Sequence, residues 1–108
     1  MKLSELEARF VRIVEGGFRD VDSIAEAQGV SFLCPGCFVK NNGTIGTHAI
    51  ICWSRSRGVP DSQVPGPGRW SLNGTGLADL TLLGDGGNNS VKTPCAHFYV
   101  TNGETVPA

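Results

Sequence analysis

Residues 32–37 read Phe-Leu-Cys-Pro-Gly-Cys, and the C-x-x-C spacing within them is the most specific signal in the chain. In such a knuckle the backbone turns tightly, so the thiolates of Cys34 and Cys37 can meet on one metal ion. Pro35 restricts φ and Gly36 tolerates positive φ, so both central residues suit the turn. Residues 30–33, VSFL, predict a strand that leads into the knuckle, as in zinc ribbons. We therefore interpret residues 34–37 as half of a structural zinc site.

Two other uses of this motif stay open on sequence grounds. A redox dithiol needs the motif at the start of a long helix in a βαβ unit, and residues 38–46, FVKNNGTIG, predict no such helix. Two disulfides would compete if the chain were secreted, because reducing compartments favour thiolates as metal ligands.

Zinc takes four ligands in a tetrahedron, so two more donors are needed. Cys95 and His97 are separated by Ala96 alone, and alternate residues of a strand point to one side. We expect Cys95 and His97 to complete a closed site with Cys34 and Cys37. Such a site is structural, because no coordination position remains for water.

Two further residues, His48 and Cys52, could also donate to a metal ion. His48 follows Cys37 by eleven residues and is the alternate ligand, able to replace Cys95 or His97; otherwise it is an ordinary solvated side chain. Cys52 lies in the apolar run IICW, where a free cysteine packs well, so we expect it in the core.

Length and composition predict one small domain that needs a staple. The chain has 108 residues, 40% of them apolar, with 15 glycines and 6 prolines. This mixture predicts many turns and little long helix, and a modest core is commonly supplemented by a metal or by disulfides. We expect a single zinc-binding domain over residues 1–108, in which residues 1–29 form a short strand and helical turns.

The alternation of apolar and polar residues predicts short strands rather than long helices. Strands are expected at residues 9–14, 30–33, 48–53, 70–72, 77–83 and 97–100, with a return strand at 104–106. Residues 54–69 form a long Pro/Gly-rich loop that is either mobile or used for contact. The expected fold class is a small β-rich (α+β) zinc-stabilised domain, with a zinc-ribbon-like knuckle on short antiparallel strands.

Several function classes are disfavoured by the same sequence. A net charge of -1 gives no general attraction to nucleic acid, and the cluster of Arg55, Arg57 and Arg69 with two tryptophans is small. No H-E-x-x-H motif occurs, and no H-x-E precedes the knuckle, so we expect no enzyme; a zinc-dependent hydrolase is the alternative. No apolar run could span a membrane, and the acidic N-terminus does not match a signal peptide.

The order of motifs resembles a family of small uncharacterised phage and prophage proteins. The likeness covers about residues 26–106 and is carried by FLCPGC, GTHAIICWSRSRGVP, PGPGRWSLNGTGLADLTL and CAHFYVTNGE. The terminal Cys and His of the family are often adjacent or spaced differently, whereas Ala96 separates them here. Some members carry an ammonia monooxygenase label, which we regard as an error because this chain has neither a membrane segment nor a histidine-rich copper site.

The resemblance implies a phage or prophage source, a structural zinc ion, and a location in the virion or the bacterial host cytoplasm. We expect a protein-interaction module, first as a minor tail, baseplate or head-associated virion component. Its partners would be phage structural subunits. The alternative is an intracellular phage protein that binds a host factor, and nucleic-acid binding ranks third.

Overall fold

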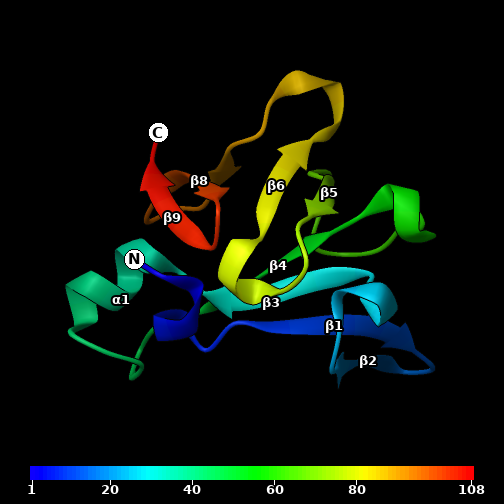
Figure 1. Ribbon diagram of the computed structural model, residues 1–108. Coiled ribbons are helices and arrows are strands. Elements are labelled where there is room, and N and C mark those ends of the chain that lie inside the picture. Colours follow the sequence, from blue (N-terminus) through cyan, green and yellow to red (C-terminus); the bar gives the residue numbers. More distant parts are fainter.

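The computed structural model describes all residues from 1 to 108 and shows a β-rich fold with three antiparallel sheets (Figure 1). The largest sheet has the strand order β2-β1-β3-β4. Its strands are β1 (Arg9–Val14), β2 (Gly17–Val21), β3 (Gly29–Leu33) and β4 (Ala49–Trp53). This architecture confirms the predicted class of a small domain built on short antiparallel strands.

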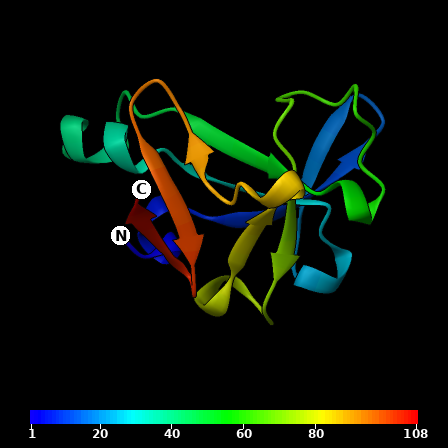
Figure 2. The same cartoon turned by 90° about the horizontal axis from the view of Figure 1, so that it is seen from above.

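The other two sheets lie above the four-stranded sheet in the view of Figure 1, and Figure 2 shows the molecule from above. One is a pair and the other has three strands in the order β7-β8-β9. The pair comprises β5 (Trp70–Asn73) and β6 (Thr81–Gly84), and the three-stranded sheet comprises β7 (Val91–Lys92), β8 (His97–Thr101) and β9 (Glu104–Pro107). Asn102 and Gly103 both have positive φ between β8 and β9, as the Asn-Gly hairpin signal predicts.

A short helix begins inside the knuckle, and it is not the long helix of a βαβ unit that a redox dithiol would need. Helix α1 (Pro35–Asn41) begins within the C-x-x-C motif, with Pro35 in its first turn, where the missing N–H costs nothing. Asn42 ends it in a left-handed conformation, and its N–H donates to carbonyls of the last turn. The helix has only seven residues, and the flanking strands β3 and β4 are antiparallel neighbours rather than parallel strands of a βαβ unit.

Two strand assignments differ from the expectation. Strand β1 ends at Val14 as expected, but the chain turns straight back through Gly16 into β2, which the charged segment around Arg19 and Asp20 concealed. The expected strand at 77–83 divides into a 3-10 turn, Leu77–Asp79, and β6. The turn forms because the Asp79 carboxylate accepts backbone N–H bonds from Thr75 and Gly76.

The core lies where the three sheets meet. One cluster of 15 buried residues draws on every sheet, and Phe32 of β3 meets Phe98 of β8 edge to face, with ring centroids 6.0 Å apart. A second, smaller cluster of Val11, Trp53 and Val59 lies on the other face of the four-stranded sheet. The two clusters account for burial on both faces of β3, whose five residues are all buried.

The 54–69 loop is anchored from within by a buried arginine. The Arg69 side chain is 4% exposed, and its guanidinium donates to carbonyl oxygens of the loop itself. These acceptors are the carbonyls of Pro60, Asp61, Gln63, Pro65 and Gly68. The indole N–H of Trp53 donates to a further loop carbonyl, that of Val64, at 2.9 Å. A chain segment poor in regular structure is thus ordered by side chains that satisfy its backbone.

Candidate metal centre

Cys34 and His48 are brought together by strand pairing. Strands β3 and β4 are in antiparallel register, with Leu33 opposite Ala49, so the next pair outward is Cys34 opposite His48. The backbone N–H of Cys34 donates to the carbonyl of His48 at 2.9 Å, which extends the ladder by one rung. Directly opposite residues of an antiparallel pair lie within side-chain contact. The loop at 42–48 therefore returns the histidine to the end of the strand that carries the cysteine.

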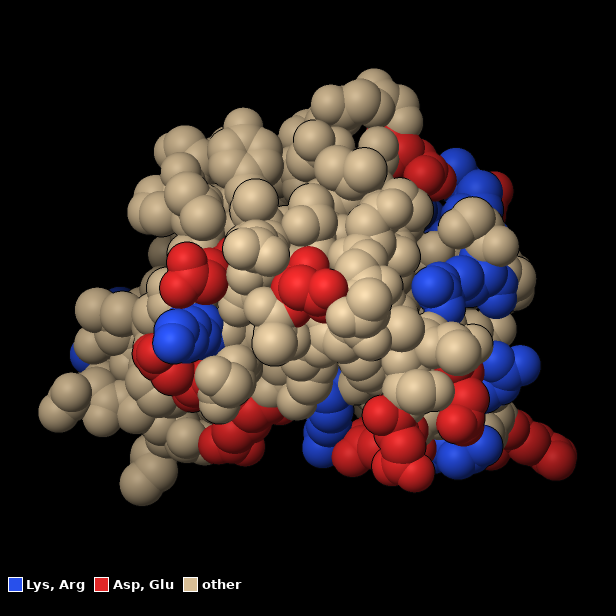
Figure 3. Space-filling view, viewed as in Figure 1, with Lys and Arg blue, Asp and Glu red and all other residues tan.

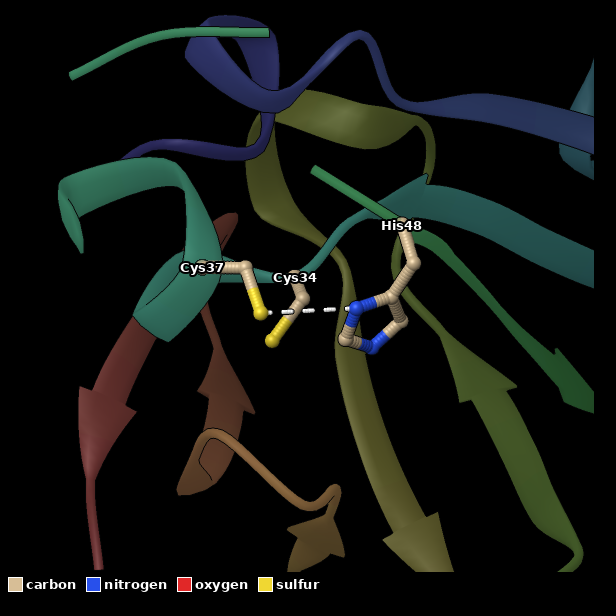
Figure 4. A group of neighbouring side chains, drawn as sticks. All are labelled: Cys34, Cys37 and His48. Atoms are coloured by element: carbon tan, nitrogen blue, oxygen red, sulfur yellow. Dashed lines mark hydrogen bonds between the residues drawn. The ribbon is translucent and has the colours of Figure 1, made fainter. Parts of the chain in front are cut away.

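Cys37 enters the same space from the first turn of α1. The Phe38 N–H donates to the Cys34 carbonyl at 2.9 Å, so the knuckle closes as a helical turn and both sulfurs point the same way. The Cys37 Sγ lies 3.4 Å from the Nδ1 of His48. Donor atoms of Cys34, Cys37 and His48 all lie within 4.8 Å of one another (Figure 4), so this group can hold a metal ion.

Cys95 lies beside this group, and its approach explains the glycine of the knuckle. The structure pairs the sulfurs of Cys37 and Cys95 as a disulfide, with their Cα atoms 5.9 Å apart. The Cys95 carbonyl lies against Gly36, where an added Cβ would clash with it and would stand 2.9 Å from the Ala96 Cβ. Gly36 is therefore needed for close packing, because only a residue without a side chain leaves room for the 93–96 turn.

The contact between Cys37 and Cys95 allows two chemical states that exclude each other. In a disulfide, Cys37 is no longer a thiolate and cannot bind a metal. Reduced to two thiolates, Cys37 and Cys95 would instead be free to share one ion with Cys34 and His48. Cys34 and Cys52 make no disulfide, so the two-disulfide framework does not form.

Thr93 organises the turn that carries Cys95, and the sequence reasoning missed it. Its Oγ1 accepts the N–H of Ala96 at 2.9 Å and that of Cys95 at 3.2 Å. The hydroxyl proton has two acceptors within reach, the Ala96 carbonyl at 3.4 Å and the Cys34 sulfur at 3.3 Å. Hydroxyl donors to a ligand sulfur orient it and stabilise its charge. The hydroxyl two residues before Cys95 was a visible signal, because threonine commonly bonds backbone N–H groups just ahead of it.

The remaining sequence-based donors lie elsewhere. His97 is exposed on β8, and its Nε2 contacts the Ser90 Oγ at 3.0 Å instead of joining the cysteines. Its strand neighbour Phe98 is the residue that turns into the core. Cys52 is fully buried opposite Val30, and burial raises the pKa of its thiol far above the ordinary value.

The basic and aromatic residues considered for nucleic-acid contact are occupied within the fold. Arg69 holds the 54–69 loop, and Arg57 donates to the carbonyls of Ile24 and Ala27. Arg55 pairs with Asp61 at 2.8 Å and with Asp85 at 2.9 Å. In the face shown in Figure 3, cationic and anionic side chains alternate, so no broad area of one sign appears there.

Comparisons with known proteins add no relative to this picture: no family model, no curated protein and no solved structure matches the chain. No helix of the structure has the length and apolar character needed to cross a membrane. The β-rich fold and the Cys/His group are therefore the basis for a functional proposal.

Proposed function

We propose that this protein is a structural zinc-binding domain that serves as a protein-interaction module, with zinc held by Cys34, Cys37, His48 and Cys95. The observation that carries the proposal is the group of Cys34, Cys37 and His48, whose donor atoms lie within 4.8 Å of one another, with Cys95 paired to Cys37 beside it. A disulfide between Cys37 and Cys95 would need neither Cys34 nor His48 beside it. A tetrahedral metal site needs all four.

The donor chemistry favours zinc over other ions. Three thiolates and one imidazole form a soft ligand set, which suits tetrahedral zinc and not magnesium or calcium. Zinc–sulfur bonds of about 2.3 Å and zinc–nitrogen bonds of about 2.0 Å place sulfur and nitrogen about 3.5 Å apart in a tetrahedron. The 3.4 Å between the Cys37 Sγ and the His48 Nδ1 agrees with that spacing.

The proposed role is structural because four protein donors fill the coordination sphere. A zinc hydrolase keeps one position for water, and this set leaves none. The ion would join the end of the β3–β4 ladder, helix α1 and the turn before β8. The β3–β4 ladder belongs to the four-stranded sheet, and the turn before β8 leads into the three-stranded sheet. Zinc would therefore add a link between two sheets in a domain with a modest core.

Metal analysis and thiol counting test the proposal together. We expect one zinc per chain by mass spectrometry and four reactive thiols after denaturation with chelator. Loss of His48 in His48→Ala should lower zinc affinity, whereas His97→Ala should retain it. A protein without zinc that shows only two thiols would contain the Cys37–Cys95 disulfide, and the proposal would then be wrong.

The biological setting of the module follows from the motif resemblance alone. That resemblance supports a phage-encoded protein, and we propose a minor virion component that packs against larger structural subunits. Mass spectrometry of purified particles is the direct test. Absence of the protein from the particles would rule out the virion role without affecting the zinc proposal.

A further inference from the structure

The free edge of β4 is the feature that remains unexplained. In an antiparallel ladder, hydrogen-bonded and non-hydrogen-bonded pairs alternate. The backbone of Cys34 is hydrogen-bonded to that of His48, and the backbone of Ser54 to that of Gln28. The pairs that contain Ala49 and Ile51 are therefore non-hydrogen-bonded pairs. The N–H and C=O groups of Ala49 and Ile51 therefore point away from β3, and no other part of the chain bonds them.

The two edges of the same sheet differ in their protection. The opposite edge, β2, carries Arg19 and Asp20, and charged side chains discourage a second strand from pairing. The β4 sequence, AIICW, has no charge and no proline. An unprotected edge of aliphatic residues is a template for strand addition.

A groove of about 520 Å³ runs along this edge and limits what can occupy it. Ala49–Ile51 of β4 form one wall, and residues 90–94, including β7, form another. Residues 65–68 and Trp70 also line the groove, so three segments of the chain enclose it. An enclosed groove favours one extended segment over the whole sheet edge of a second copy.

The 90–94 wall of the groove also presents backbone groups that point away from their own sheet. Thr93 and Ala96 exchange both backbone bonds, so Lys92, the next residue of β7, directs its own N–H and C=O away from β8. Among the residues that line the groove, Lys92 is the only lysine or arginine, and no carboxylate accompanies it. The lining therefore favours an aliphatic segment that carries an acidic side chain.

We propose that this groove binds an extended peptide segment of a partner protein by strand addition to β4, with aliphatic side chains at alternate positions and a carboxylate that meets Lys92. The inference rests on the proposed interaction module and specifies its kind of partner. Zinc supports the groove, because His48 lies at the end of β4 and Cys95 follows the 90–94 wall. The metal would set the spacing of the two walls.

Selection from a linear nonapeptide library displayed on particles provides the probe. Selected peptides are synthesised with a fluorophore, and their Kd for the zinc-loaded protein is measured by anisotropy. Ala49→Pro removes one outward N–H and keeps the inner ladder, as edge strands tolerate. We expect Ala49→Pro to weaken binding about tenfold and the control Ala49→Val to leave it unchanged. Lys92→Glu should weaken the binding of acidic peptides severalfold.

Three results would overturn the inference. The first is that the library yields no peptide selective for the wild type over Ala49→Pro. The second is that a selected peptide has the same Kd for the wild type and for Ala49→Pro. The third is a wild-type dimer in sedimentation velocity that Ala49→Pro converts to a monomer, which would assign the edge to a second copy. If Ala49→Pro does not fold, amide exchange decides: a bound peptide should slow exchange at Ala49 and Ile51 in the wild type, and unchanged rates refute the proposal.

Metal content measured on the same samples separates this inference from the proposed function. Zinc-loaded protein without selective peptide binding refutes strand addition and leaves the zinc site intact. Zinc-free protein that still binds peptide with sensitivity to Ala49→Pro refutes the zinc proposal and leaves strand addition standing.

Discussion

Replacing Gly36 by alanine tests the knuckle where it meets the 93–96 turn. The new methyl group would overlap the Cys95 carbonyl and stand 2.9 Å from the Ala96 Cβ and 3.0 Å from the Cys95 carbonyl carbon. These neighbours are backbone atoms or a Cβ, so no flexible side chain can move aside. The turn must shift, and Cys95 moves with it.

The expected cost is that of an overpacked site, about 1–3 kcal/mol. For a domain of this length, each kcal/mol lowers Tm by about 4–8 °C, so Gly36→Ala should melt about 5–20 °C below the wild type. If the turn is held in place by zinc, the same energy appears as weaker zinc binding. A cost of about 1–3 kcal/mol corresponds to a loss of about 5- to 150-fold in zinc affinity.

Two measurements and a matched glycine make the test specific. Zinc affinity is measured by competition with a chromophoric chelator, and thermal unfolding is followed with and without zinc. Gly17→Ala is the control, because an added Cβ there meets nothing within 4 Å. Wild-type zinc affinity and Tm in Gly36→Ala would refute the packing argument, and an equal loss in Gly17→Ala would show that the effect is not local.

Three other outcomes are expected. His48→Ala should lower zinc affinity at least tenfold and His97→Ala less than twofold, as measured by chelator competition; the reverse order would return the ligand role to His97. Cys52 should resist alkylation at pH 8 in the folded protein and react after unfolding, because burial raises its pKa and keeps the thiol neutral; mass spectrometry of the alkylated protein tests this. Arg69→Met should destabilise the fold by about 2–4 kcal/mol in denaturant unfolding, because five loop carbonyls lose their donor; a change below about 0.5 kcal/mol would show that the loop does not depend on it.

Short-range patterns in the sequence predicted much of the fold. The strands at 9–14, 30–33 and 97–100, and the Asn-Gly hairpin, follow from alternation and turn chemistry within a few residues. The sequence reasoning missed the pairing of β1 with β2, because charged residues on the edge strand β2 mask the alternation of apolar and polar residues. The sequence reasoning missed helix α1 because seven residues are too few to show a helical period, and its local signals are only Pro35 in the first turn and Asn42 at the end.

Long-range placement was harder to predict, and the two histidines show why. Position within a strand suggested His97, since it shares a side with Cys95 in an ideal extended chain. In the structure, Cys95 belongs to the Thr93–Ala96 turn, and the ladder of β8 begins only at His97. The alternation argument therefore does not apply across that boundary.

The sequence by itself determined the β-rich class and the proximity of Cys34 and Cys37, because these depend on composition and on neighbours within one turn. Only the tertiary structure decided that His48 lies beside the knuckle, that Cys95 packs over Gly36, and that Arg69 fills the 54–69 loop with donors. Each of these depends on a register between distant segments, which is set by the packing of three sheets around one core and is not encoded in local spacing.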